Sequence, residues 1–462
     1  MAMSGTPPCV VVVGAGPAGI RAAETLAAAG LVPVVIDEGV RAGGQIYRRP
    51  PDGFKRPPGT LYGSEVGKAV ALHAAFDAMA AAGRLQHRSG SSVLAVADGR
   101  VQVLGPEGAS WMAFDRLILA TGATDRLAPV PGWEHAGVYS LGAMQIALKA
   151  QGAAFGRRMV LAGSGPLLTL LASQLLKAGA GVAAVLDTAP LGAQLRCCPG
   201  LLSRPALALR GVAMRATLGR LYHPGAQLVA IDTDDQGPAS IRWRDAAGRE
   251  RHTPCDAVGL GWHLRPETLL AELAGCAFDW DEAWRQWLPR GDAFGRAAPG
   301  VYLAGDGYRL LGADGAEVSG RLAASACLSD LGLPAPDASR DIKRLSRIKA
   351  FAKGVARAFP WPAGMVSALP DQAVVCRCEA VTAGSIREAV VHGGAEANRA
   401  KSICRAGMGR CQGRYCQLSS AEIIAATVGF SSPEAVGRLR GQAPARPAPV
   451  WALAAEAPAE TP

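Results

Sequence analysis

The chain has 462 residues, of which 49% are hydrophobic and 19% are charged. This balance excludes an intrinsically disordered protein, and the length predicts two or three domains. The formal net charge of +10 would suit a nucleic-acid partner, but aromatic residues make up only 5% of the chain and no basic run alternates with them, so we expect no nucleic-acid binding.

No apolar stretch reaches the ~20 residues that a membrane-spanning helix requires. The apolar residues 10–13 lead directly into a glycine-rich motif, which is not the pattern of a signal peptide. The 11 cysteines are an odd number, and in a long chain without an export signal they indicate metal ligands and free thiols. We therefore expect a cytoplasmic protein without a transmembrane segment, whose association with a membrane would come through a larger complex.

Residues 9–38 predict a strand, a glycine-rich turn, a helix and a second strand. Gly14 permits a tight turn, Gly16 lets a pyrophosphate approach the backbone, and Gly19 lets the helix pack closely on the strand. Glu38 ends the second strand, where its carboxylate can accept hydrogen bonds from ribose hydroxyls. The complete turn consists of Gly14, Ala15, Gly16, Pro17, Ala18 and Gly19. Its position between a strand and a helix is the context that a dinucleotide-binding motif requires.

The same order of elements returns in residues 159–187, with strands predicted over residues 159–162 and 182–187 and a helix predicted over residues 166–177. Gly163 and Gly165 occupy the turn and Asp187 ends the second strand, but Leu168 stands in place of the third glycine. The start of this helix is also rich in leucine, which favours burial against protein. Two interpretations stay open, a domain that binds NAD(P)H and a retained scaffold or subunit interface without a nucleotide.

Three further segments make the interpretation of the first nucleotide-binding motif more specific. They are the loop Gly43, Gly44 and Gln45, the strand end Ala120, Thr121 and Gly122, and the strand end Gly305 and Asp306. Together with the glycine turn, this set resembles the two-dinucleotide-domain flavoproteins, the broad family of the disulfide reductases and ferredoxin reductases, over residues 8–330.

This resemblance implies a bound FAD and a role for several residues. Asp306 would bind the ribityl hydroxyls, and the Gly43 to Gln45 loop would lie along the flavin ring. The strand that contains Val93 would contact the adenine through its backbone. The helix near Val318, expected to begin at about Glu317, would point its positive end at the pyrimidine edge of the flavin.

Four cysteines near the C-terminus form two pairs, Cys376 with Cys378 and Cys411 with Cys416. The second spacing suits zinc, but the first is too short for most zinc sites. The arginines beside these cysteines suit the negative charge of an oxidised [2Fe-2S] cluster on four thiolates. Cys404 is a spare thiol. The arginines are Arg377, Arg405, Arg410 and Arg414.

Residues 371–430 resemble the [2Fe-2S] domain of the bacterioferritin-associated-ferredoxin type, with most of the likeness between Arg405 and Cys416. The whole chain resembles the α subunits of multi-subunit amino-acid and opine dehydrogenases, a family that includes opine oxidases, D-hydroxyproline and L-proline dehydrogenases, hydrogen cyanide synthase and the sarcosine oxidase α subunit. The resemblance implies that the partner is a β-type flavoprotein oxidase subunit, with room for a small γ subunit and with a downstream electron acceptor. Some relatives hold FMN at a subunit interface, and some hold NAD or ATP in place of this FAD.

The function implied by this family is electron transfer for a partner subunit that oxidises an amino acid or opine, such as proline, D-hydroxyproline or another secondary amine. Three alternatives stay open: a subunit of a hydrogen cyanide synthase that acts on glycine, an NAD(P)H-dependent ferredoxin reductase that uses Gly163, Gly165 and Asp187, and a non-catalytic assembly subunit. No histidine or glutamate stands out as a general base, so the sequence assigns no catalytic residue.

We expect an α/β fold, a two-dinucleotide-binding-domain flavoprotein with a small C-terminal helical [2Fe-2S] domain. The expected parts are an FAD-binding domain of residues 1–125 and 285–330, a second dinucleotide-type domain of residues 126–284, a basic linker of residues 331–370, a [2Fe-2S] domain of residues 371–440, and a disordered tail of residues 441–462.

Overall fold

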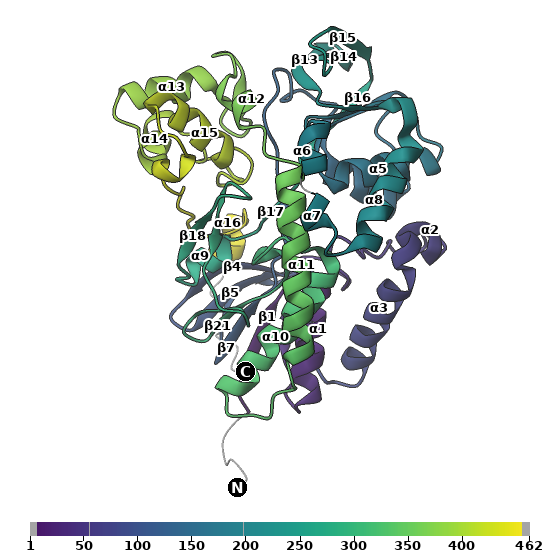
Figure 1. Ribbon diagram of the computed structural model, residues 1–462. Helices are drawn as coiled ribbons and strands as arrows, with labels where there is room; N and C mark the ends of the chain where they lie inside the picture. The colour runs from purple at the N-terminus through teal and green to yellow at the C-terminus, as the bar shows by residue number, and fades with distance from the viewer. Residues whose placement is uncertain (1–6, 55, 197, 455–462) are drawn as a thin grey trace.

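The computed structural model describes residues 7–54, 56–196 and 198–454. Figure 1 shows three regions: the first nucleotide-type domain at the bottom, the second at the upper right, and a C-terminal helical domain at the upper left. The mixed α/β architecture agrees with the predicted fold class. None of the described helices has both the length and the apolar character needed to cross a bilayer.

The first domain is built on a six-stranded sheet in the order β20-β21-β7-β1-β2-β3. All its pairings are parallel except that of β20 with β21. Because side chains alternate along a strand, Val10 and Val12 of β1 face one core while Val11 and Val13 face another, and all four are buried. The strands are β1 (Val10–Val13), β2 (Val34–Ile36), β3 (Gln86–Arg88), β7 (Arg116–Leu119), β20 (Arg296–Ala298) and β21 (Val301–Leu303).

Helices cover one face of this sheet and a small sheet covers the other. On the first face α1 (Pro17–Ala28) packs along α10 (Gly312–Asp330), with α3 (Val66–Ala81) beside α1. On the second face lies an antiparallel sheet in the order β4-β5-β6, in which β4 is an edge strand. Its strands are β4 (Ser92–Ala97), β5 (Arg100–Gly105) and β6 (Gly108–Ala113).

The second domain repeats the plan with a five-stranded sheet in the order β12-β11-β10-β16-β9. Helix α5 (Pro166–Lys177) follows the second glycine turn, and a separate antiparallel sheet is formed by β13, β14 and β15. The strands of the five-stranded sheet are β9 (Val138–Ser140), β10 (Met159–Ser164), β11 (Val182–Asp187), β12 (Tyr222–Pro224) and β16 (Ala257–Trp262), and the others are β13 (Gln227–Asp234), β14 (Gly237–Arg244) and β15 (Glu250–Pro254).

The chain crosses between the two domains at a pair of short strands. β8 (Ala123–Asp125) leads out of the first domain, and β17 (Leu264–Pro266) pairs with it in the antiparallel direction on the way back. Helix α9 (Leu269–Leu273) then packs into the core that contains Val11 and Val93. The second domain therefore ends near residue 266, whereas the sequence suggested 284, because the return crossing precedes α9 and the hairpin of β18 (Phe278–Asp281) with β19 (Gln286–Pro289).

Helix α11 (Ser339–Ala358) runs along both domains, as Figure 1 shows. It contacts α10 of the first domain and α7 (Cys198–Leu201) of the second. A Cβ on Gly354 would lie 2.9 Å from the Gly200 carbonyl carbon, so the two backbones touch here. The linker is thus a packed helix with Leu345 and Ile348 buried against α10.

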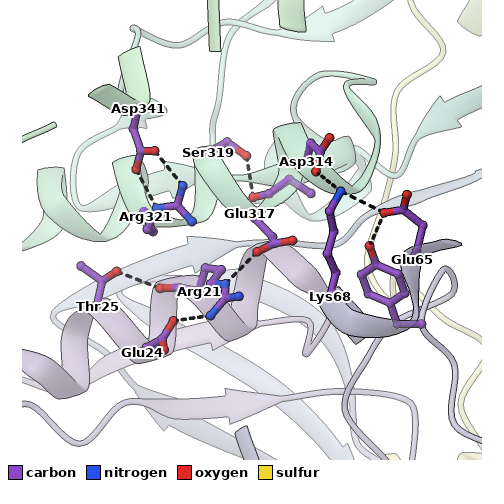
Figure 2. Close-up of polar contacts among 12 residues, drawn as sticks. Arg21, Glu24, Thr25, Glu65, Lys68, Asp314, Glu317, Ser319, Arg321 and Asp341 are labelled. Atoms are coloured by element: carbon purple, nitrogen blue, oxygen red, sulfur yellow. Dashed lines mark hydrogen bonds and ion pairs between the residues drawn. The ribbon is translucent and has the colours of Figure 1, made fainter. Parts of the chain in front are cut away.

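Charged side chains reinforce this contact between the domains. Asp314 in the first turn of α10 pairs with Lys68 of α3 at 2.8 Å, with Arg204 of the second domain, and with Arg344 of α11 at 3.5 Å. Figure 2 shows Lys68 reaching toward Asp314 and, on the neighbouring turn, Glu317 bonded to Arg21 of α1. These ion pairs join both domains and α11 around the start of α10.

The C-terminal helical domain packs on the second domain through a shared core. The Trp133 Nε1–H donates to the Val374 carbonyl oxygen at 2.6 Å, which ties the two domains together. The elements of this domain are α12 (Ala363–Ser367), β22 (Val374–Cys376), β23 (Val381–Thr382), α13 (Ala383–Val391), α14 (Ala397–Cys404) and α15 (Gln417–Val428).

The described part of the tail is ordered, which corrects the predicted disorder for residues 441–454. The Ala445 N–H donates to the Leu94 carbonyl oxygen of edge strand β4 at 2.6 Å, and Ala445 is buried. Helix α16 (Val450–Ala454) then packs near β6. The alanine-proline composition suggested disorder, but an edge strand offers unpaired backbone groups that such a segment can bind. Residues 455–462 lie outside the described part of the chain.

Candidate functional site

The first glycine turn joins β1 to the start of α1. Gly14 has a φ of +107°, and its N–H donates to the Ile36 carbonyl oxygen at 2.7 Å. A Cβ on Gly19 would overlap the Gly14 carbonyl oxygen, so only glycine allows α1 to approach the turn this closely. Gly16 caps the helix and Pro17 begins it, which leaves a helix N-terminus suited to an anionic phosphate.

The loop of Gly43, Gly44 and Gln45 lies directly against this turn. The Gly43 N–H donates to the Ala15 carbonyl oxygen at 2.8 Å. A Cβ on Gly44 would lie 2.9 Å from the Gly16 Cα. Gln45 is exposed, and its side-chain oxygen accepts a hydrogen bond from Arg48. The two glycine-rich segments therefore meet with bare backbone, as a cradle for a phosphate-containing group requires.

The two predicted strand ends meet the same turn. A Cβ on Gly14 would overlap the Ala120 carbonyl oxygen, and a Cβ on Gly305 would lie 2.8 Å from the Ala18 Cβ. Thr121 and Gly122 both bond to the backbone of Glu267, through Thr121 Oγ1 to the carbonyl oxygen at 2.6 Å and from the Glu267 N–H to the Gly122 carbonyl oxygen at 2.9 Å. The predicted flavin segments thus converge on one region of the first domain.

Asp306 is held at the start of α10. Its Oδ1 accepts hydrogen bonds from the N–H groups of Leu311 at 2.8 Å and Gly312 at 2.9 Å. Burial raises the pKa of Asp306, and the two hydrogen bonds from backbone N–H groups oppose this rise. The helix begins at Gly312, earlier than the expected Glu317, so Val318 lies fully buried in its second turn rather than at the helix end.

Two adjacent carboxylates follow β2, and they have different partners. The Asp37 carboxylate accepts hydrogen bonds from the Ala15 N–H at 2.5 Å and from the Gly39 N–H at 2.6 Å, so it holds the glycine turn. The Glu38 side chain is 53% exposed and pairs with Arg446 of the tail at 2.5 Å. The sequence prediction named Glu38 and missed Asp37. The sequence itself shows that a second acidic residue, Asp37, directly precedes Glu38 at the end of this strand.

Val93 lies in β4 of the same domain. Its side chain is buried in the core beneath the sheet, so its backbone is the part that a ligand could contact. A register irregularity between Val93 and Ala95 interrupts the pairing with β5. The neighbouring Leu94 carbonyl oxygen is bonded by Ala445, as described above. The tail therefore borders the strand predicted to contact adenine.

The second glycine turn is occupied by the protein's own side chains. Asp187 is 0% exposed and accepts hydrogen bonds from Ser164 Oγ at 2.9 Å, the Ala189 N–H at 2.9 Å and the Tyr222 hydroxyl at 2.5 Å, so both of its oxygens are used. A Cβ on Gly165 would lie 2.9 Å from His263 Nδ1. The imidazole thus covers the position where a pyrophosphate would approach the turn.

His263 is itself fixed by the linker that follows α11. Its Nε2 is 2.8 Å from the Phe359 carbonyl oxygen, and its ring packs edge-on against Phe359 and Trp284. Burial lowers the pKa of His263 to about 4, so the ring is neutral at physiological pH. This environment is that of a structural histidine.

The four cysteines in the C-terminal domain form two contacting pairs. A hydrogen bond from the Cys416 thiol lowers the pKa of Cys376 to about 6, with help from backbone N–H groups. Cys378 hydrogen-bonds to Cys411, and burial together with this bond raises the pKa of Cys378. The described residues contain no group of three or more histidine, cysteine, aspartate or glutamate side chains placed to hold one metal ion. Two pairs of thiols suit a cluster with two irons better than a single tetrahedral zinc.

Glycine and arginine residues surround these pairs. The Gly407 N–H bonds to Cys376, and a Cβ on Gly409 would overlap the Cys378 Cβ. Arg265 of β17 is buried, donates to the Arg414 carbonyl oxygen, and interacts electrostatically with Cys416 and Cys411. Sequence patterns could not identify Arg265, because it is far from the cysteines along the chain.

Three of the four arginines beside the cysteines have separate partners. Arg414 donates to Glu267 at 2.6 Å, Arg405 to Glu379 at 3.0 Å, and Arg377 to the Glu134 carbonyl oxygen at 3.2 Å. Cys404 is half-buried, with its pKa raised by burial, and belongs to neither pair.

Two family models match the chain. Pyridine nucleotide-disulphide oxidoreductase matches residues 8–320, and BFD-like [2Fe-2S] binding domain matches residues 374–426. The chain belongs to the pyridine nucleotide-disulphide oxidoreductase family and carries a BFD-like domain after it. It is a flavin- and iron-sulfur-dependent oxidoreductase.

Proteins that are similar to almost the whole of this chain show which members of this class it resembles. One of the subunits of the opine oxidase of Agrobacterium tumefaciens is 38% identical over 96% of this chain and 91% of its own. Hydrogen cyanide synthase subunit HcnB of Pseudomonas aeruginosa is 32% identical over 96% of this chain and 97% of its own. L-proline dehydrogenase from P. horikoshii has the same fold, with a TM-score of 0.69 at 18% identity over 96% of this chain and 79% of that one. The predicted fold and family are confirmed.

Replacing Glu38 by Ala should weaken FAD binding. A ribose hydrogen bond to a carboxylate contributes roughly 1 to 3 kcal/mol, so the Kd for FAD should rise by about fivefold to 150-fold. Fluorescence titration of the FAD-stripped protein measures this change. Asp77→Ala is the matched control, because Asp77 is a 58% exposed carboxylate in the same domain whose partner is Arg49 and not the glycine turn. Equal Kd values for wild type and Glu38→Ala would contradict the assignment.

Proposed function

We propose that this chain is the electron-transferring subunit of a heteromeric flavin-dependent dehydrogenase, whose partner subunit oxidises a secondary amine such as an opine, proline or D-hydroxyproline. The observation that carries the proposal is the contrast between the two nucleotide turns. The first presents bare glycine backbone, whereas Asp187 and His263 close the second. A subunit that receives electrons from another flavoprotein needs no nicotinamide site.

In this proposal FAD binds across the first domain. Its pyrophosphate would lie on Gly14, Gly16 and Gly19 at the start of α1, and Glu38 would accept hydrogen bonds from the ribose. The two backbone N–H groups that donate to Asp306 both bond to Oδ1, so Oδ2 would accept a hydrogen bond from a ribityl hydroxyl. The bare backbone at Gly44 supports an approach by the flavin along that loop.

The cluster is proposed to bind to the paired thiols of Cys376 with Cys416 and Cys378 with Cys411. FAD accepts electrons in pairs and a [2Fe-2S] cluster passes them singly, so together they would form a relay. Arg265 and the Gly407 N–H lie beside the thiolates, where positive charge and a hydrogen-bond donor favour the reduced, more negative cluster.

The purified chain alone should oxidise no amino acid or opine, and activity should appear on co-expression with a β-type flavoprotein subunit. The relatives named as subunits of opine oxidase and hydrogen cyanide synthase support this expectation. Dye-linked dehydrogenase assays on opines, proline, hydroxyproline, sarcosine and glycine provide the measurement. Substantial turnover by the lone chain would contradict the proposal.

A second candidate is oxidation of glycine, which the likeness to subunit HcnB favours. The same assay separates the two, because glycine would then be turned over in preference to secondary amines. An NAD(P)H-dependent reductase is the weaker alternative, since Asp187 already uses both oxygens. Anaerobic addition of NAD(P)H should leave the flavin absorbance unchanged, and bleaching of the flavin would restore the reductase interpretation.

A further inference from the structure

A short segment of the tail lies between the two proposed cofactor sites. We call residues 441–446 the strap. On one side the Pro444 carbonyl oxygen accepts a hydrogen bond from Gln412 Nε2 at 2.6 Å, next to the ligand Cys411. On the other side Ala445 bonds to Leu94 of β4 at 2.6 Å. The strap therefore contacts the cluster loop and the adenine-side strand at the same time.

Glu267 connects the same two regions from the interior. Glu267 is 8% exposed, and its backbone bonds to Thr121 and Gly122 of the flavin segment. Its carboxylate accepts a hydrogen bond from Arg414 Nε at 2.6 Å. Arg414 lies between Cys411 and Cys416 in the chain. One buried side chain thus joins the flavin segment to the loop that carries two cluster ligands.

The strap extends this connection to the proposed ribose ligand. Arg446 lies 3.7 Å from the Glu267 carboxylate and 2.5 Å from that of Glu38. The charges alternate from Glu38 through Arg446 and Glu267 to Arg414. Glu267 is the member of this series whose backbone is also bonded to the flavin segment.

We propose that Glu267 is a positioning residue that makes binding of FAD and of the cluster cooperative. The inference rests on the proposed positions of the two cofactors. A cluster orders the loop that holds Arg414, Arg414 fixes the Glu267 carboxylate, and Glu267 and the strap then hold the glycine segment and Glu38 in place for FAD. Because coupling between two binding sites is reciprocal, FAD must stabilise the cluster by the same factor by which the cluster tightens FAD.

The test measures this coupling factor in the full-length chain. The Kd for FAD is determined by titration of FAD-stripped protein with and without its cluster, and the affinity for the cluster is compared through its loss to a chelator with and without FAD. In the wild type the cluster should tighten FAD binding by about fivefold or more, the usual lower range for coupled sites. In Glu267→Gln both cofactors should still bind, with a coupling factor near one.

The matched control is Glu422→Gln. Glu422 is also a buried carboxylate but belongs to α15 of the C-terminal domain, where it pairs with Arg285 of the first domain at 2.9 Å. Among the described residues it forms no hydrogen bond to the strap or to the flavin segment. A merely structural role would lower stability in both variants alike, whereas only Glu267→Gln should lose the coupling. Arg446→Gln breaks the exposed end of the series and should also reduce the coupling. This variant provides the test if Glu267→Gln fails to fold.

Two results would overturn the inference: independent binding of FAD and cluster in the wild type, or full coupling in Glu267→Gln and Arg446→Gln. A chain that binds no FAD under any condition would overturn the proposed function and this inference together.

Discussion

Replacing Cys411 or Cys416 by Ser should abolish or strongly alter the EPR signal of the reduced [2Fe-2S] cluster. Each variant removes one thiol from a contacting pair, and a serine hydroxyl is a much poorer ligand for iron at neutral pH because its oxygen stays protonated. Anaerobically prepared, dithionite-reduced protein provides the measurement, together with iron and sulfide analysis.

Cys404→Ser is the control for this experiment. Cys404 is close to the cluster region and half-buried, yet it belongs to neither pair, so its replacement should leave the EPR signal unchanged. Stoichiometric zinc instead of iron in the wild-type protein would contradict the assignment of the site, as would an unaltered signal in both ligand variants.

Gly19→Ala should cost the protein its bound FAD and much of the stability of the first domain. The new Cβ would overlap the Gly14 carbonyl oxygen, so α1 must move away from the turn that β1 and β2 hold in place. Forced overlap of this kind typically costs about 1 to 3 kcal/mol and displaces the backbone. Flavin content after gel filtration and the thermal unfolding temperature measure the two effects.

Gly67→Ala provides the comparison. Gly67 lies exposed in α3 of the same domain, and a Cβ there would meet no atom within 4 Å. Alanine is the better helix former, so this variant should keep its FAD and be as stable as the wild type or slightly more stable. If both glycine variants retain FAD equally, the close approach at Gly19 is not needed for binding.

The sequence predicted the repeated nucleotide units well because their signals are local. Helix α5 and strand β11 have the predicted bounds, and β10 begins at the predicted residue, since a buried parallel strand is a run of apolar residues bounded by glycine. The start of α10 was placed too late. Gly312 is a poor helix former, but Asp306 accepts hydrogen bonds from the backbone there and supports an earlier start.

Contacts between distant parts of the chain were beyond prediction. Composition alone marked residues 441–462 as disordered, whereas the pairing of Ala445 with Leu94 depends on an edge strand that only the folded domain presents. The same holds for Arg265 and Glu267, which reach the cluster loop from the second crossing between domains. Patterns along the sequence identify the cofactor motifs but not the residues that connect them.

The backbone contact between Gly200 and Gly354 bears on how the protein moves. The two strands of the domain crossing, β8 and β17, form the natural hinge between the nucleotide-type domains. Helix α11 touches both domains, so any swing about that hinge would have to separate Gly354 from Gly200 and break the ion pairs of Asp314. The two domains should behave as a rigid frame, so the proposed electron transfer would take place in a fixed geometry rather than by alternate docking of the domains.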